Sequence, residues 1–282
     1  MSDDWFSAKL APDGAVEDGC HLEEARAMKY YLRQETTATE AARAITHPIV
    51  TADNPGEDLA RLWGFLMDSL LELPAEHAES LLELLKAIEK LPEPDFTAID
   101  GSKRPYEKLW RGLPGFGHLW SDSYQSGCWR RTAAATSGPA RSALRDTHVR
   151  KAEIEARLVT AGLGGIPIDW GYEVVADALE SGNALLDFEV PAAARWLLIC
   201  GQRFRQGAEN GEKSWALKPH VTTSSMTPSR DLWEAPSDQV LSLGRWSSWE
   251  GRLRELQGNQ GVVQDAATAA LGAMREAVHT TS

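Results

Sequence analysis

Residues 191–205 constrain the fold of this chain more than any other stretch, because they are apolar almost all the way round a helix. A surface helix carries one apolar stripe, whereas a helix that is apolar on most of its sides must be buried. Pro191 suits the first turn, where its missing N–H would have no partner within the helix. The residues that form this broad stripe are Ala193, Trp196, Leu197, Leu198, Ile199, Cys200 and Phe204. The sequence predicts a buried central helix that at least two other helices cover.

Apolar residues recur at helical spacing over most of the remaining chain. The pattern predicts helices over residues 22–32, 41–45, 55–73, 75–91, 139–161, 170–179, 245–256 and 262–278, with short helices and turns in the aromatic segment 106–129. We expect the second of these helices to end before Pro48. No alternation typical of strands competes with this pattern. The predicted fold is therefore all-α, a single large bundle-like domain with a buried central helix and a long polar loop.

The expected organisation has three parts. Residues 1–20 are read as an N-terminal arm that docks through Trp5 and Phe6, and residues 21–279 as the helical domain. Within that domain, residues 207–243 form the longest polar stretch. A connection of this length is usually a lid, an ordered loop or a disordered segment, and the sequence leaves these alternatives open.

The charge of the chain limits its partners. The net charge of the 282 residues is -12, which argues against binding to nucleic acid or to an anionic membrane surface. Residues 1–100 hold 21 acidic and 8 basic residues, whereas the rest of the chain holds 20 acidic and 21 basic residues. We expect any site for an anion to lie in the C-terminal two thirds.

The cysteines and the N-terminus predict a soluble cytoplasmic protein. Cys20, Cys128 and Cys200 are too few and too scattered for a disulfide framework, so we expect reduced thiols. The chain begins with neither a basic nor an apolar leader region, and no apolar run has the length of a membrane span.

The usual catalytic signatures are missing, since there is no Walker loop, no His-Glu-x-x-His motif and no Gly-x-Ser-x-Gly motif. The glycines of residues 162–165 follow a predicted helix instead of a strand, so we expect them to end that helix and not to form a dinucleotide loop. The 7 histidines show no ligand-like spacing. The sequence therefore predicts no metal site and no cofactor.

Four residues are the catalytic candidates. A spacing of four places His118 and Asp122 on one helical face, where a carboxylate can orient an imidazole, and Tyr124 follows closely; the alternative is a decorated surface. Arg195 lies in the central helix, where a guanidinium needs a carboxylate or a ligand anion. The alternative for Arg195 is an internal ion pair.

A second group of residues is predicted to bind a ligand. Arg203 lies two turns after Arg195, and the chain has 11 tryptophans that can line an apolar pocket. The ligand-binding candidates are Trp120, Trp196, Arg203 and Trp246. Core packing is the alternative role for the tryptophans.

Several of these segments, taken in order, resemble a known family. They are the helix from His148 to Leu158, Ala192-Ala-Ala-Arg-Trp196-Leu-Leu, the polar loop, Arg245-Trp246-x-x-Trp249 and the alanine-rich helix with Ala273-Met274, preceded by Trp110-x-x-Leu113-Pro114-Gly115-Phe116-Gly117. Over residues 55–278 the chain resembles the fungal family catalogued as domain of unknown function 3632. The resemblance implies a fungal intracellular helical protein, and it brings no catalytic residues to carry over.

Two function hypotheses follow. The first is a cofactor-independent protein that binds an apolar small molecule, such as a cyclase or isomerase of fungal specialised metabolism, with the ligand between the central helix and the aromatic segment under the polar loop. The second is a helical interaction or scaffold protein that holds a protein partner without catalysis. The many aromatics and the candidate lid favour the first hypothesis, and the sequence leaves the oligomeric state open.

Overall fold

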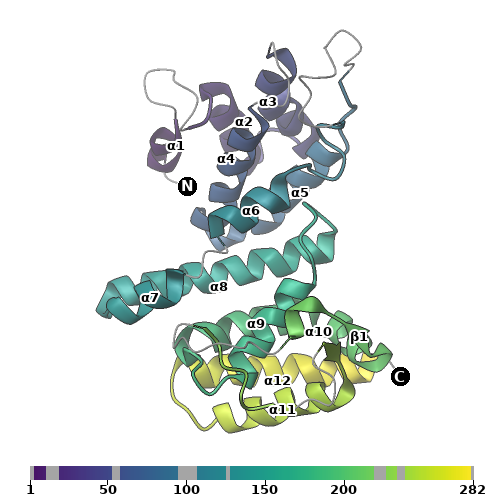
Figure 1. Ribbon diagram of the computed structural model, residues 1–282. Coiled ribbons are helices and arrows are strands. Elements are labelled where there is room, and N and C mark those ends of the chain that lie inside the picture. Colours follow the sequence, from purple (N-terminus) through teal and green to yellow (C-terminus); the bar gives the residue numbers. More distant parts are fainter. Residues whose placement is uncertain are drawn as a thin grey trace. The chain divides into compact units, whose positions relative to one another are not determined.

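The computed structural model describes residues 3–10, 19–52, 58–94, 107–124, 128–218, 227–233 and 239–280 (Figure 1). These residues are predominantly helical, and they contain one small sheet of two strands, so the predicted all-α class is confirmed. The chain divides into two compact units, unit 1 with residues 1–126 and 161–165, and unit 2 with residues 127–160 and 166–282. The single folding domain stays a prediction, which the number of unfolding transitions tests.

Unit 1 is a small helical bundle preceded by a short helix. Its elements are α1 (Asp3–Lys9), α2 (Leu22–Leu32), α3 (Ala38–Thr51), α4 (Leu59–Glu72), the 3-10 helix η3 (Ala75–His77), α5 (Ala78–Glu89) and α6 (Phe116–Tyr124). Helix α3 packs on α2 and α5, and α4 packs on α5 and α6. The helices predicted over residues 55–73 and 75–91 are confirmed as α4 and α5, which pack on each other. The core of unit 1 includes the fully buried side chains of Ile45, Leu62, Trp63, Leu84 and Ile88.

The prediction that the helix around residues 41–45 ends before Pro48 is wrong. Helix α3 begins at a capping box, in which the Thr37 side chain accepts a hydrogen bond from the N–H of Glu40, and it continues through Pro48 to Thr51. Proline so close to the end of a helix removes only one backbone hydrogen bond. Burial of both Ile45 and Ile49, one turn apart on either side of the proline, favours the longer helix.

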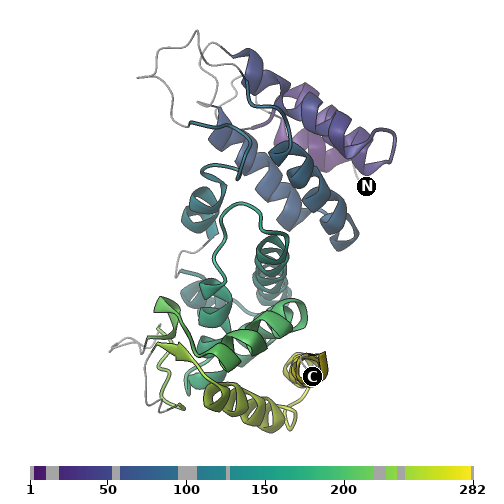
Figure 2. The same cartoon turned by 90° about the vertical axis from the view of Figure 1, so that its right-hand side faces the viewer.

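Unit 2 holds the remaining helices and the small sheet (Figure 2). Its elements are α7 (Cys128–Ala135), α8 (Gly138–Ala161, of which the last residue falls in unit 1), α9 (Asp169–Glu180), α10 (Leu186–Asn210), β1 (Glu212–Lys213), the 3-10 helix η5 (Trp215–Leu217), β2 (Val240–Leu241), α11 (Leu243–Leu256) and α12 (Val262–Thr280). Strands β1 and β2 pair antiparallel, with Glu212 opposite Leu241 and Lys213 opposite Val240.

Helix α10 is the predicted central helix, and α9, α11 and α12 all pack against it. Two details of the prediction are wrong. The helix begins at Leu186, so Pro191 lies inside it and not in its first turn. Leu198, which the prediction placed in the buried stripe, is exposed. Gly171 of α9 lies directly against the Trp196 ring of α10. A Cβ atom added to Gly171 would lie 2.4 Å from the Cε3 atom of Trp196. Glycine at this position therefore lets α9 approach α10.

The stretch 207–243 is not an unstructured connection in its described parts. Its first residues complete α10, which ends at Gly211 with a φ of +61°, and β1, η5 and β2 follow. Residues 219–226 and 234–238 lie outside the described residues. Ser242 then caps the start of helix α11, because its side chain accepts a hydrogen bond from the N–H of Arg245. Among the helices that the structure describes, none is long and apolar enough to cross a membrane.

Candidate functional site

The catalytic candidates from the sequence lie in different units. His118 and Asp122 share one face of α6 in unit 1, as their spacing predicts, and their Nε2 and Oδ2 atoms are 3.5 Å apart. Both are exposed, the His118 side chain to 85%. The Tyr124 side chain lies outside the described residues. Arg195 is exposed on α10 in unit 2, with its Nε atom 3.9 Å from a Glu153 oxygen. The catalytic role of these residues stays a prediction.

Three of the four ligand-binding candidates are core tryptophans, as the alternative of core packing states, and the fourth is an arginine in an ion pair. Trp120 in unit 1, and Trp196 and Trp246 in unit 2, are buried in their cores. Arg203 is held by Glu212, with nitrogen to oxygen distances of 2.6 and 2.8 Å, and it also donates to the Tyr172 hydroxyl group. The three buried tryptophans offer a ligand little surface, and the guanidinium of the exposed Arg203 is already paired with Glu212.

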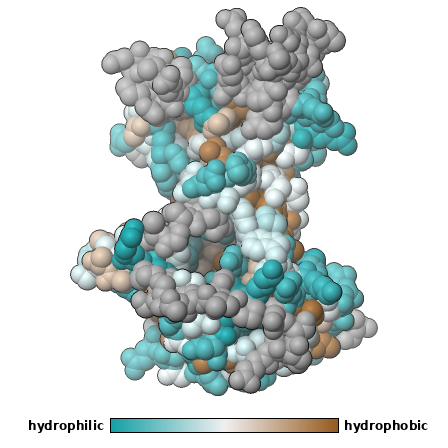
Figure 3. Space-filling view, in the orientation of Figure 1, coloured by the Kyte–Doolittle hydropathy of each residue, from teal (hydrophilic) through white to brown (hydrophobic). Residues whose placement is uncertain are grey.

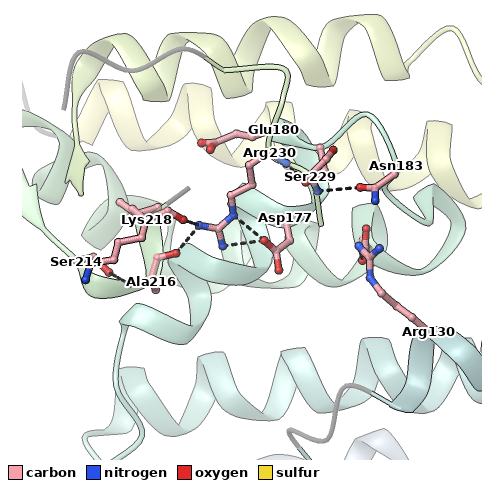
Figure 4. Close-up of polar contacts among 12 residues, drawn as sticks. Arg130, Asp177, Glu180, Asn183, Ser214, Ala216, Lys218, Ser229 and Arg230 are labelled. Atoms are coloured by element: carbon pink, nitrogen blue, oxygen red, sulfur yellow. Dashed lines mark hydrogen bonds and ion pairs between the residues drawn. The ribbon is translucent and has the colours of Figure 1, made fainter. Parts of the chain in front are cut away.

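The structure brings together a set of side chains at the C-terminal end of α9 that sequence reasoning missed. Arg230 has a positive φ of +46° and a buried side chain. Its Nε atom donates to Asp177 at 2.7 Å, and its Nη1 atom donates to the carbonyl groups of Ala216 and Lys218 at 2.6 and 2.8 Å. Figure 4 shows this guanidinium between the Asp177 carboxylate and the two carbonyl groups. One arginine thus ties the chain after η5 to α9.

Arg245 makes a second tie of the same kind. Its Nε and Nη2 atoms donate to the two carboxylate oxygens of Glu180 at 2.6 and 2.9 Å. The same guanidinium donates to the carbonyl groups of Leu217 and Val240 at 3.3 and 3.1 Å. The Trp249 indole N–H also donates to Glu180, at 2.7 Å. Burying two charges is unfavourable unless they are paired and hydrogen bonded, and both conditions hold here.

Polar side chains fix the remaining part of this segment. Asn183 accepts from the N–H of Ser229 and donates to the carbonyl group of Thr227, both at 2.9 Å. Asp231 accepts from the Ser229 hydroxyl and the Gly182 N–H, both at 2.6 Å, and these bonds lower the pKa of its carboxyl group. We call residues 211–218, 227–233 and 239–242 the pinned loop, because side-chain hydrogen bonds hold it to α9 and α11.

The pinned loop exposes apolar side chains. Trp215 is 55% exposed, Leu232 is 48% exposed, and Leu243, the residue that follows the loop, is 44% exposed. Lys213 and Lys218 on either side of Trp215 in sequence are exposed as well. Ser214 fixes the backbone beside the indole, since its hydroxyl donates to Asp169 at 2.5 Å and accepts from the N–H of Ala216 at 3.2 Å. On the face seen in Figure 3, hydrophobic side chains of unit 2 form small areas among hydrophilic ones. The loop therefore presents an exposed indole on a fixed backbone, with two exposed lysines close to it in the sequence.

A further buried carboxylate lies where α7 meets α10. Glu189 accepts from Arg130 and from the N–H of Leu185, and burial raises the pKa of its carboxyl group to about 8 against the opposing effect of Arg130. His148 stacks on Trp129 with ring centroids 4.2 Å apart, and burial lowers the pKa of its imidazole to about 3. Both shifts favour the neutral form of the side chain. Trp129, which precedes Arg130, stacks on Phe188, which precedes Glu189, with ring centroids 5.7 Å apart. We therefore assign the pair of Glu189 and Arg130 a structural role.

Comparison with known proteins places most of the chain in one family. A family model with the description "Protein of unknown function (DUF3632)" matches residues 63–253. This range includes both arginines of the pinned loop network and the exposed Trp215. Neither the search of curated proteins nor the search of solved structures gave a significant match.

Proposed function

The chain belongs to the DUF3632 family, whose description names no activity, and we propose from the geometry of unit 2 that it is a helical interaction protein that holds a protein partner at the pinned loop. The single observation that carries this proposal is the exposure of Trp215 on a backbone fixed by buried arginines. The proposal develops the second of the two hypotheses from the sequence.

An exposed tryptophan on a fixed backbone is suited to binding. Leaving a large apolar side chain in water forgoes the free energy of burying it, and this free energy becomes available when a partner covers the ring. Tryptophan is enriched among the residues that dominate binding energy at protein interfaces. Because Ser214, Arg230 and Arg245 already hold the loop, association need not order it, and the entropic cost of binding is reduced.

The charges beside the indole indicate the chemistry of the partner. Exposed Lys213 and Lys218 flank Trp215, so the complementary surface is an apolar pocket with Asp or Glu at its rim. This agrees with the expectation that an anionic group binds in the C-terminal two thirds of the chain. The net charge of -12 disfavours an anionic membrane as the partner, since the whole chain would be repelled.

The first hypothesis, a cofactor-independent small-molecule protein of specialised metabolism, stays a prediction. It places the ligand between the aromatic segment, which lies in unit 1 up to residue 126, and the central helix, which lies in unit 2. The cytoplasmic location expected from the cysteines and the N-terminus also stays a prediction.

A peptide selection tests the proposal. Random dodecapeptides displayed on phage are selected on the full-length protein, and the enriched peptides are synthesised and their Kd measured by fluorescence anisotropy at low and high salt. We expect peptides that combine aromatic or aliphatic residues with Asp or Glu. Trp215→Ala should raise their Kd at least about tenfold, because a central anchor is lost. Lys213→Glu with Lys218→Glu should raise the Kd and weaken its dependence on salt.

The matched control is Val262→Ala, which removes an exposed apolar side chain at the start of α12, outside the pinned loop, and should leave the Kd unchanged. Enriched peptides whose binding does not depend on Trp215 would overturn the proposal. Binding of the protein to vesicles of anionic phospholipid that is lost in Trp215→Ala would overturn it as well, in favour of a membrane surface.

A further inference from the structure

The short helix α1 lies on unit 1 with its two ends held by charges of opposite sign. At its start, the Asp3 carboxylate is 2.8 Å from the ammonium group of Lys29 in α2. It is also 2.9 Å from the guanidinium group of Arg33, the residue that follows α2. These cations, Lys29 foremost, lower the pKa of the Asp3 carboxyl group. At its end, Lys9 is 2.7 Å from Asp68 and 2.8 Å from Glu72 of α4.

Aromatic contacts lie between the two charged ends. Phe6 is buried, and Trp5 packs edge-on against it with ring centroids 5.1 Å apart. Trp5 also stacks on Phe65 of α4 at 5.9 Å, and its indole N–H donates to Glu72 at 2.8 Å. The surface under α1 therefore has a basic end, an aromatic centre and an acidic end.

This pattern accepts one kind of segment in one direction. A helix that fits must begin with an acidic residue, continue with an aromatic pair and end with a basic residue, and a reversed helix would place like charges together. Helix α1 is too short to be stable by itself, so its structure depends on this surface. Exposed ion pairs contribute little each, and Phe6 is the one buried residue of α1 within its described range, so its docking is weaker than that of the bundle helices.

We propose that the surface under α1 is an exchange site, at which the α1 of a second copy of this chain takes the place of the chain's own α1. The second copy carries the same segment, so every contact described above is kept in the exchanged state. This inference is independent of the function proposed for the pinned loop, because the exchange site lies in unit 1 and the pinned loop in unit 2.

Charge reversal separates exchange from docking within one chain. The first variant, Asp3→Lys with Lys9→Glu, reverses the charges at the two ends of α1. The second variant reverses the charges of the surface under α1 and carries Lys29→Glu, Arg33→Glu, Asp68→Lys and Glu72→Lys. Each variant keeps the net charge of the chain, and each has a mismatch between α1 and its own surface. In a mixture, the native α1 of the second variant matches the native surface of the first, and the reversed pair matches too.

We expect the equimolar mixture to form a one-to-one heterodimer by native mass spectrometry, while each variant alone stays monomeric. The variant with all six substitutions is the control, because the charges of α1 match those of its own surface again; it lacks the hydrogen bond from Trp5 to Glu72 but should stay monomeric. A mixture that shows only the two monomers would overturn the inference. If the second variant does not fold by circular dichroism, Asp3→Lys mixed with Lys29→Glu and Arg33→Glu makes the same test at one end of α1.

Discussion

The two units use buried charge differently. In unit 1, the buried carboxylate of Glu24 pairs with both terminal nitrogens of Arg61, at 2.6 and 2.7 Å, and this pair joins helix α2 to helix α4. In unit 2, the buried Glu180 holds Arg245, whose other hydrogen bonds go to carbonyl groups of the pinned loop. The first pair links regular helices, whereas the second replaces the hydrogen bonds that an irregular segment cannot make for itself.

This comparison teaches how a long polar connection becomes ordered. Each buried carbonyl group needs a donor, and helices and sheets supply donors by repetition along the chain. The pinned loop has only the short pairing of β1 and β2, the single turn of η5 and a few further backbone hydrogen bonds within its described residues. Guanidinium groups therefore supply donors to several of its carbonyl groups. Arginine is suited to this role because it offers five N–H donors in a fixed plane and keeps its charge. The order of the pinned loop in unit 2 should therefore depend on its buried arginines and their carboxylate partners. Unit 1 should depend less on its buried ion pair, because that pair joins helices that are regular by themselves.

The largest expected effect comes from removal of the Glu180 carboxylate. Glu180→Ala leaves Arg245 buried without its counter-charge and removes the acceptor of the Trp249 indole, so the free energy of unfolding should fall by about 3 to 5 kcal/mol. Trypsin should then cut fastest in the pinned loop, after Lys213 or Lys218. Glu250→Ala is the control, since its pair with Arg254 is exposed and its loss should cost less than about 0.5 kcal/mol. Equal trypsin resistance in Glu180→Ala and wild type would contradict the tie between loop and helix.

A pair of glycine substitutions sharpens the comparison with a smaller effect. Gly171→Ala in unit 2 should lower the free energy of unfolding by about 1 to 3 kcal/mol, because the added methyl group would lie 2.4 Å from the buried Trp196 ring. Gly64→Ala on α4 of unit 1 should instead raise it by about 0.5 to 1 kcal/mol, because no atom lies within 4 Å and alanine favours the helix. Denaturant titration measures both. Destabilisation of similar size in the two variants would show that packing does not distinguish the positions.

The smallest effect, over the single pH unit that is measured, is a pH dependence that comes from unit 2. Burial raises the pKa of Glu189 to about 8 from 4.5, so the folded state binds more protons than the unfolded state between these values. This contribution is complete below pH 4.5 and is lost as the pH rises through 8, with a slope of at most about 1.4 kcal/mol per pH unit. His148 has the opposite sign, because its pKa falls to about 3 from 6.5 and its contribution is lost as the pH falls.

The interval from about pH 7.5 to 8.5 reports mainly the carboxylate, since the imidazole, with a pKa of 6.5 when unfolded and about 3 when folded, is almost entirely neutral there in both states. Urea titrations across this interval should show stability that declines with pH in the wild type and much less in Glu189→Gln. A flat wild-type profile would mean that Arg130 keeps Glu189 ionised.

Much of the fold was predictable because helical periodicity is a local property. The face of α11 with Trp246, Trp249, Leu253 and Leu256 is buried as its spacing predicts. The glycine that ends α8 is also as expected, since Gly162 has a φ of +68°. The errors at Pro48 and Pro191 have one cause, namely that burial of neighbouring apolar residues can outweigh the local cost of proline in a helix.

The candidate site was less predictable. The tryptophans proposed as ligand contacts are core residues, whereas the exposed Trp215 is not among the candidates that the sequence suggests. One signal was present in the sequence, since Arg245 stands directly beside the predicted apolar face of α11 and so requires a counter-charge. Its partner could not be named, because many acidic residues were available.

The sequence by itself determined the all-α class, the buried central helix and most helix boundaries, since spacing and end signals along the chain specify these. Tertiary structure alone decided which charges are paired and which tryptophan faces solvent. Arg245 lies 65 residues from Glu180 along the chain, and only the packing of α9 against α11 brings them together. A pattern in the sequence states that a buried charge needs a partner, but the three-dimensional arrangement of helices selects that partner.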